Sequence, residues 1–207
     1  MRLTWSSFSG ANMHRFRYCL LSLIPVAFAP AAPVPTHLIP KEDPICYPRR
    51  VGDSWVHQLA DSELTGTVTK VEKVDGGTRV TSELKESTRQ TSYFVTSIVS
   101  PRGVQVIEYA GQKIDPPVWW LKLPHGPKNE WTGTWPGGLD FAFETKEWEV
   151  VEVPAGKFKA IRVERHELQN GTMLGTTTYW YAPGVGCIKI AGRSPARAMK
   201  SFTPGKG

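Results

Sequence analysis

The residues with the chemistry for catalysis or metal binding are scattered along this sequence. Of its five histidines, no two that follow residue 31 lie within five residues of each other: His37, His57, His125 and His166. No HExxH or CxxC pattern occurs, so the spacing predicts no metal site. His57 shares an apolar strand face with Trp55 and Leu59. That position is typical of a packed, hydrogen-bonded histidine rather than a ligand.

A nucleophile with a neighbouring base is also not indicated. No Gly-x-Ser-x-Gly elbow is present. Ser54 and His57 are close in sequence, but residues three apart on a strand point to opposite faces, so the two side chains would not meet. Asp53 and Ser54 are instead expected to shape the turn that enters a strand.

Several carboxylates in one stretch invite comparison with glycosidases, at Glu144, Glu147, Glu149 and Glu152. Glu147 and Glu149 alternate with apolar residues, which is the ordinary pattern of a half-exposed strand. We therefore predict no catalytic residues and no enzyme activity. A hydrolase with an unrecognised site is the third-ranked alternative.

Phosphate and nucleic-acid ligands find no matching feature. The stretches Asp75-Gly76-Gly77 and Gly184-Val185-Gly186 are predicted hairpin turns rather than loops that lead into helices. The net charge is +6, but no basic cluster lies in the central part of the chain. The sequence thus predicts no cofactor and no nucleic-acid partner.

Aromatic residues are the remaining signal, since the chain has eight tryptophans and several of them crowd together. Large rings usually fill a thin β-core, and that explanation is favoured for Trp55, Trp131 and Trp180. Others lie beside Pro and Gly loops or in the aromatic strand near residue 180. We predict that these line or rim an apolar ligand site: Trp119, Trp120, Trp135, Tyr179 and Tyr181.

The elements that position these residues are predicted to be strands. Short runs of alternating apolar residues are separated by turn signals, and no run shows sustained helical periodicity. The predicted strands cover residues 54–60, 65–74, 78–86, 90–99, 104–110, 131–135, 141–146, 148–153, 158–167, 173–181 and 187–191. The pattern predicts an all-β fold, an antiparallel meander that forms a curved half-barrel or open barrel.

The two halves of the chain resemble each other. "PRRVGDSW" and "PHGPKNEW" both place Trp seven residues after Pro, and each is followed by a hairpin with a Gly turn. An aromatic strand and a turn containing Pro and Gly follow in both halves. A pseudo-twofold repeat is the economical interpretation, although chance similarity of turns remains an alternative.

The chain begins with a predicted export signal, residues 1–31, with Met13 as an alternative start. A basic stretch precedes an apolar run that is too short for a transmembrane span. Residues 32–46 are rich in proline and are predicted to form a linker to a β domain of residues 47–191. Residues 192–207 are predicted to form a basic disordered tail. The expected location is the periplasm or cell envelope, or outside the cell.

Export would leave two cysteines, Cys46 and Cys187, in an oxidising compartment. Because they lie at the two ends of the predicted domain, we predict a disulfide between them. Two buried free thiols are the alternative.

Three stretches carry a resemblance to a known family: "YPRRVGDSW", "VPAGKFKAIRVE" and "TTYWYAPGVGCIKI". Together they resemble the signature of a family of uncharacterised exported bacterial β-proteins, whose motif includes Trp-Tyr-Ala-Pro-Gly-Val-Gly. The resemblance implies a half-barrel similar to that of periplasmic lipoprotein carriers, and it carries no catalytic residues.

Two functions follow in rank. The first is a non-catalytic domain that binds an apolar or lipidic ligand in the cell envelope. The second is an interaction module with a filled core that contacts an envelope protein or polymer.

Overall fold

The computed structural model describes residues 45–89, 92–123 and 129–206, which form twelve β-strands and no α-helix. The first six strands are β1 (Ser54–Gln58), β2 (Glu63–Val74), β3 (Gly77–Glu86), β4 (Ser92–Ser100), β5 (Gly103–Tyr109) and β6 (Gln112–Lys122). The second six are β7 (Glu130–Trp135), β8 (Leu139–Val153), β9 (Gly156–Gln169), β10 (Thr172–Ala182), β11 (Gly186–Gly192) and β12 (Arg197–Thr203). The predicted all-β class is confirmed. The sequence had indicated no strand over residues 112–122.

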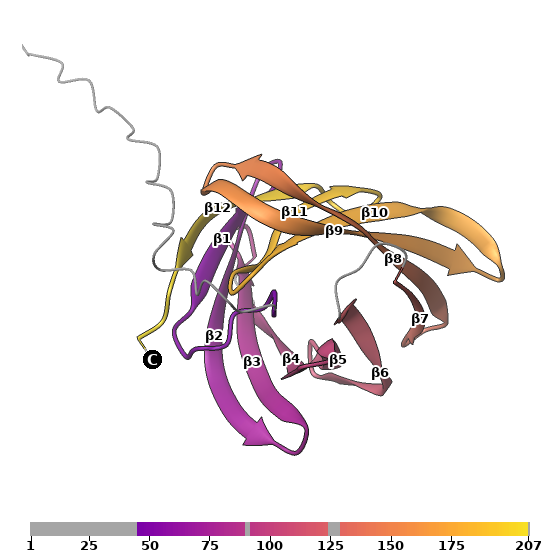
Figure 1. The fold of residues 1–207 in the computed structure, drawn as a ribbon, viewed down its shortest axis with the longest axis horizontal. Helices are drawn as coiled ribbons and strands as arrows, with labels where there is room; N and C mark the ends of the chain where they lie inside the picture. The colour runs from indigo at the N-terminus through magenta and orange to yellow at the C-terminus, as the bar shows by residue number, and fades with distance from the viewer. Residues whose placement is uncertain (1–44, 90–91, 124–128, 207) are drawn as a thin grey trace, which may run out of the picture.

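All strand pairs are antiparallel, and each strand pairs with its neighbour in sequence except at one point. The sheet order is β6-β5-β4-β3-β2-β1-β12-β11-β10-β9-β8-β7, so β1 also pairs with β12. The sheet curls into a nearly closed barrel whose one unsealed seam lies between β6 and β7 (Figure 1). The predicted meander and open barrel are therefore confirmed.

The seam has a local cause in β6. Pro116 and Pro117 have no backbone N–H and cannot donate to a ladder, so this strand suits the edge of a sheet. Side chains bridge the gap instead: Trp131 Nε1 donates to the carbonyl oxygen of Trp119 at 3.0 Å. Gly133 allows the close approach, because a Cβ there would lie 3.2 Å from a methyl group of Val118.

The core consists of three clusters of buried apolar side chains. Two contain residues that face the barrel interior, such as Phe143 and Val95. The third lies where the β8–β9 turn packs against β12, and there the backbone N–H of Ala155 donates to the carbonyl of Met199 at 3.0 Å. The described chain contains no apolar helix with the length to span a bilayer.

The segment that precedes β1 enters the barrel rather than lying outside it (Figure 1). Cys46 is fully buried, and the hydroxyl of buried Tyr47 lies 3.2 Å from Ser97 Oγ. The carbonyl of Ile45 accepts a hydrogen bond from the N–H of Gly184 at 3.0 Å. The prediction of a linker up to residue 46 is thus wrong for residues 45 and 46. Residues 32–44 and the predicted signal, 1–31, lie outside the described residues.

The turn between this segment and β1 is organised by Asp53, as the sequence predicted. Its Oδ2 accepts hydrogen bonds from the N–H groups of Arg49 at 2.9 Å and Arg50 at 2.8 Å. Its Oδ1 accepts one from the N–H of Gly205 at 2.7 Å. One buried carboxylate therefore joins the two ends of the described chain.

Both cysteines are free thiols, so the predicted Cys46–Cys187 disulfide is not formed. The two residues belong to the same part of the core, as expected from the pairing of the chain ends. Burial raises the pKa of the Cys46 thiol to about 12 and that of Cys187 to about 11. Both thiols are therefore protonated at neutral pH, as in the alternative of buried free thiols.

The sheet continues past the predicted domain end at residue 191. Residues 197–203 form β12, so the prediction of a disordered tail is wrong for this segment. Met199 is fully buried and His57 lies opposite it in the β1–β12 pair. Lys200 adds an ion pair with Glu63 at 2.5 Å. The tail was missed because its strand is stabilised by pairing with residues about 140 positions away, which local sequence does not show.

The strand order agrees with the proposed internal repeat. The two Pro-to-Trp stretches precede β1 and β7, and the two Gly-turn hairpins are β2–β3 and β8–β9. The two aromatic strands are β4 and β10. A true structural symmetry between the halves stays a prediction.

Candidate functional site

The barrel encloses a cavity of about 490 Å³. This volume lies within the range of about 300–1,000 Å³ that is usual for small-molecule sites. Aromatic and aliphatic side chains dominate its wall, and both halves of the chain contribute. Its apolar lining includes Trp55, Leu59, Leu64, Leu84, Tyr93, Val95, Tyr109, Leu139, Phe141, Phe143 and Ile190.

Four of the five predicted ligand-contacting aromatics line this cavity: Trp120, Trp135, Tyr179 and Tyr181. The fifth, Trp119, does not. Neighbours on a strand point to opposite faces, so only one of Trp119 and Trp120 can face the interior. Trp119 instead packs against the core near the seam, with the Lys122 ammonium 5.7 Å from its ring centre. Ligand contact by the other four stays a prediction.

The aromatic rings form two packed groups around the cavity. Tyr109 contacts Tyr93 with ring centres 5.3 Å apart and meets Trp135 edge-on at 5.4 Å. Tyr179 and Tyr181, which lie on the same face of β10, stack at 6.0 Å. Such contacts hold the rings in fixed positions, so part of the apolar wall is preformed.

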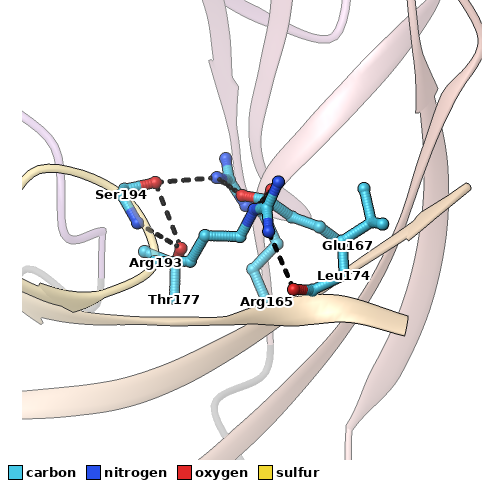
Figure 2. A network of polar contacts seen from close by, with 6 residues as sticks. All are labelled: Arg165, Glu167, Leu174, Thr177, Arg193 and Ser194. Carbon is cyan, nitrogen blue, oxygen red and sulfur yellow. Dashed lines mark hydrogen bonds and ion pairs between the residues drawn. The ribbon is translucent and has the colours of Figure 1, made fainter.

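A polar network interrupts the apolar wall where β9, β10 and the β11–β12 loop meet (Figure 2). Glu167 accepts from Arg165 Nη2 at 2.6 Å and from Arg193 Nε at 2.8 Å. Arg193 Nη1 also donates to the carbonyl of Leu174 at 2.8 Å. Arg165 and Glu167 are mostly buried, with side chains 18% and 10% exposed. One carboxylate thus serves two guanidinium groups.

Ser194 extends this network into the β11–β12 loop (Figure 2). Its hydroxyl accepts from Arg165 Nη2 and from Thr177 Oγ1, each at 3.1 Å. Its backbone N–H donates to Thr177 Oγ1 at 3.1 Å. These bonds fix the loop that leads to β12 and its Arg197 against the wall that carries Arg165.

Arg165 also contacts aromatic faces. Its guanidinium carbon lies 4.6 Å from the ring centre of Phe141 and 5.2 Å from that of Tyr179. Stacking of this kind favours a planar, weakly hydrated cation in an apolar wall. The guanidinium is therefore positioned from several sides.

His57 lies in the same wall and is 3% exposed. Its Nε2 lies 2.8 Å from the carbonyl oxygen of Cys187, which can only accept, so Nε2 carries the proton. Burial, and secondarily the charge of Arg197, lowers the pKa of His57 to about 4. The prediction of a packed, hydrogen-bonded histidine is confirmed.

A second polar cluster lies away from the cavity, where Glu144, Glu164 and His166 bring ligand-type atoms within 4.8 Å of one another. Lys146 already pairs with Glu144 at 2.5 Å and with Glu164 at 3.5 Å. His166 Nδ1 lies 2.8 Å from Thr176 Oγ1. The cluster is accounted for as an ion-pair network on the strand faces that alternate with Arg165.

The fold, but not the sequence, has known counterparts. It resembles an exported-protein fold. The crystal structure of a Bacteroides fragilis NCTC 9343 protein, described as exported with a YmcC-like fold, matches with a TM-score of 0.55. Identity is 14%, and the match covers 76% of this chain and 98% of that one.

A second crystal structure shows a weaker likeness. It is of a Parabacteroides distasonis ATCC 8503 protein described as a lipoprotein, with a TM-score of 0.45 and 13% identity over 79% of this chain and 100% of that one. No family model and no curated protein matches the chain. The likeness at this level concerns the fold alone.

The charged residues of the cavity wall were not predicted from the sequence. A signal existed for Arg165, because alternation along β9 places it on the same face as buried Val163 and Glu167. Arg197 gave none, since the segment that contains it was predicted to be a tail. Its place in the wall depends on the pairing of β12 with β1 and β11.

Proposed function

We propose that this protein is an exported, non-catalytic β-barrel that binds an apolar or lipid-like ligand in its interior. The supporting observation is the cavity of about 490 Å³, whose wall is mainly aromatic and aliphatic. Burying apolar surface in such a site contributes roughly 25 cal/mol per Å² of gross driving force. An elongated hydrocarbon chain would use that wall without needing specific polar contacts.

Export is supported by two independent features. The first 31 residues follow the basic, apolar and small-residue plan of a secretory signal. The Bacteroides fragilis protein of similar fold is described as exported. The choice between periplasm, envelope and medium rests on neither.

A protein-interaction module is the second candidate, and the seam is the observation that favours it. Strands β6 and β7 are the two edges of the sheet, and an edge strand can pair with an added strand of a partner. A module of this kind needs no cavity, however. The cavity therefore ranks ligand binding first.

Catalysis has the least support among the described residues. Both thiols are protonated at neutral pH, and the carboxylates of the Glu144 cluster are paired with Lys146. His57 is neutral and donates to a backbone carbonyl, with no hydroxyl or thiol nucleophile hydrogen-bonded to it. We therefore propose a binding rather than a catalytic role.

Binding can be tested with N-phenylnaphthylamine, an apolar dye that fluoresces when it leaves water. We expect saturable binding to the wild-type protein. Leu84→Trp adds a large ring to the cavity wall and should weaken dye binding at least tenfold. Lys85→Trp, at an exposed neighbouring position on β3, is the matched control and should bind as the wild type does.

Absence of dye binding to the wild-type protein would contradict the proposal. So would equal binding by all three proteins, because the dye would then occupy a site outside the cavity.

A further inference from the structure

The cavity wall contains buried polar atoms whose hydrogen bonds are not made within the described chain. They are His57 Nδ1, Arg165 Nε and Arg197 Nε, and all three residues line the cavity. Folded proteins satisfy nearly all buried polar atoms, so a group of exceptions at one cavity indicates a polar partner that enters it. The two Nε–H groups are donors, and His57 Nδ1 is an acceptor because Nε2 carries the proton.

The charges of the wall are also unequal. Arg165 and Arg193 share the single carboxylate of Glu167. Arg197 has no ion pair with a carboxylate of the described residues. The carboxylate of Glu86, which also lines the cavity, pairs with Arg89 at 3.1 Å and accepts from the Ser62 and Thr88 hydroxyls. The wall therefore carries an excess of positive charge.

The two cavity arginines belong to one region of the wall. Arg197 lies opposite Ile190 in the β11–β12 pair, and Ile190 lies opposite Tyr179 in the β10–β11 pair. Two strand spacings are about 10 Å, which a pair of arginine side chains can span. Arg165 already lies over the Tyr179 ring at 5.2 Å. Tyr179 is thus the common neighbour of both guanidinium groups, and it separates neither from the cavity.

An uncompensated guanidinium in an apolar wall is costly unless an anion accompanies it. Planar guanidinium groups match carboxylates and phosphates, which accept several N–H donors at once. The surrounding rings and aliphatic side chains suit a hydrocarbon chain. An anionic amphiphile combines the two requirements.

We propose that the cavity takes an amphiphile with one anionic head group, a carboxylate or a phosphate monoester, held by Arg197 and Arg165. The inference rests on the proposed function and names the ligand class of that site. The hydrocarbon chain lies among the aromatic residues, and Arg197, with no carboxylate partner of its own, makes the principal head-group contact.

The test compares three probes with the same chain but different head groups: palmitate, hexadecyl phosphate and hexadecanol. Each displaces N-phenylnaphthylamine from the purified full-length protein below its micelle concentration. Hydrogen bonds to charged groups contribute about 1.5–3 kcal/mol, so at least one anionic probe should bind roughly tenfold or more tightly than hexadecanol. Which anion binds more tightly distinguishes a carboxylate from a phosphate head group.

Arg197→Met keeps the length of the side chain and removes the charge. It should abolish the preference for anions and leave hexadecanol binding unchanged, while Arg102→Met, in the exposed β4–β5 turn, should keep the preference. Circular dichroism shows whether each variant is folded, and the wild-type comparison stands even if Arg197→Met does not fold.

Equal binding of all three probes to the wild type would overturn the head-group inference and leave the proposed function intact. A preference for anions that persists in folded Arg197→Met would overturn the role of Arg197. Binding of none of the probes would overturn both the inference and the proposed function.

Discussion

Replacing Glu167 by Gln tests whether this carboxylate holds the charged part of the cavity wall together (Figure 2). Its side chain is 10% exposed and accepts from Arg165, 18% exposed, and Arg193, 47% exposed. Removing one partner of a buried pair typically costs 3–5 kcal/mol, because the other charge is left uncompensated. The contact with Arg193 contributes less because water screens it. We therefore expect Glu167→Gln to lower the free energy of unfolding by about 3 kcal/mol.

Urea denaturation followed by tryptophan fluorescence measures this change, with an unchanged m-value as evidence that the native barrel is intact. Glu152→Gln is the matched control, since Glu152 and its partner Lys157 are 73% and 68% exposed. An exposed pair is worth about 0–1 kcal/mol. A loss for Glu167→Gln below about 1 kcal/mol, or one equal to that of the control, would refute the assignment of Glu167 as the anchor of Arg165.

Three further substitutions test other contacts of the fold. Because the pKa of buried His57 is lowered from 6.5 to about 4, the unfolded chain takes up its proton first, so stability falls as pH drops from 6.5 to 4. The loss is about 3 kcal/mol, and His57→Gln should flatten this part of a stability-against-pH curve; an unchanged curve would show that another group titrates. Asp53→Ala leaves three backbone N–H groups without their acceptor and should cost about 2–4 kcal/mol in urea denaturation, against less than about 0.5 for exposed Asp61→Ala; equal losses would contradict this role. Gly66→Ala would place a Cβ 2.2 Å from the Trp55 indole and should cost about 1–3 kcal/mol by the same assay, while a neutral effect would show that the indole is free to move.

Local patterns were sufficient to predict most of the strands. The Asn170-Gly171 turn between β9 and β10 has both residues at positive φ, 50° and 76°, which is the conformation that favours this residue pair in a hairpin. The turn at Asp75-Gly76-Gly77 between β2 and β3 is predictable for the same reason, with Gly76 at φ 74°. Alternation of apolar residues then assigns the inner and outer faces of each strand.

Features that depend on distant pairing could not be read from the sequence. Strand β12 is rich in basic and small residues and is stabilised by β1, so its local composition resembles that of a tail. Cys46 follows a proline-rich stretch, yet the barrel closes around it. Trp119 and Trp120 could be assigned to opposite faces only after residues 112–122 were known to form a strand.

The candidate site was predictable in its aromatic part and not in its charged part. The predicted rings Trp120, Trp135, Tyr179 and Tyr181 line one cavity, because the barrel brings β6, β7 and β10 around a common interior. Arg165 and Arg197 come from strands far apart in sequence, and their excess charge is apparent only when their carboxylate partners are known. Sequence patterns record alternation well and ion pairing poorly.

The central claim, that the barrel carries an apolar ligand, is tested most directly by native mass spectrometry. The full chain is expressed so that it is exported, purified without detergent and weighed intact. The account predicts an adduct of lipid-like mass that is released on denaturation, with an anionic species after extraction. A spectrum that contains the mass of the protein alone, from a preparation whose dye-binding site is also absent, would contradict it.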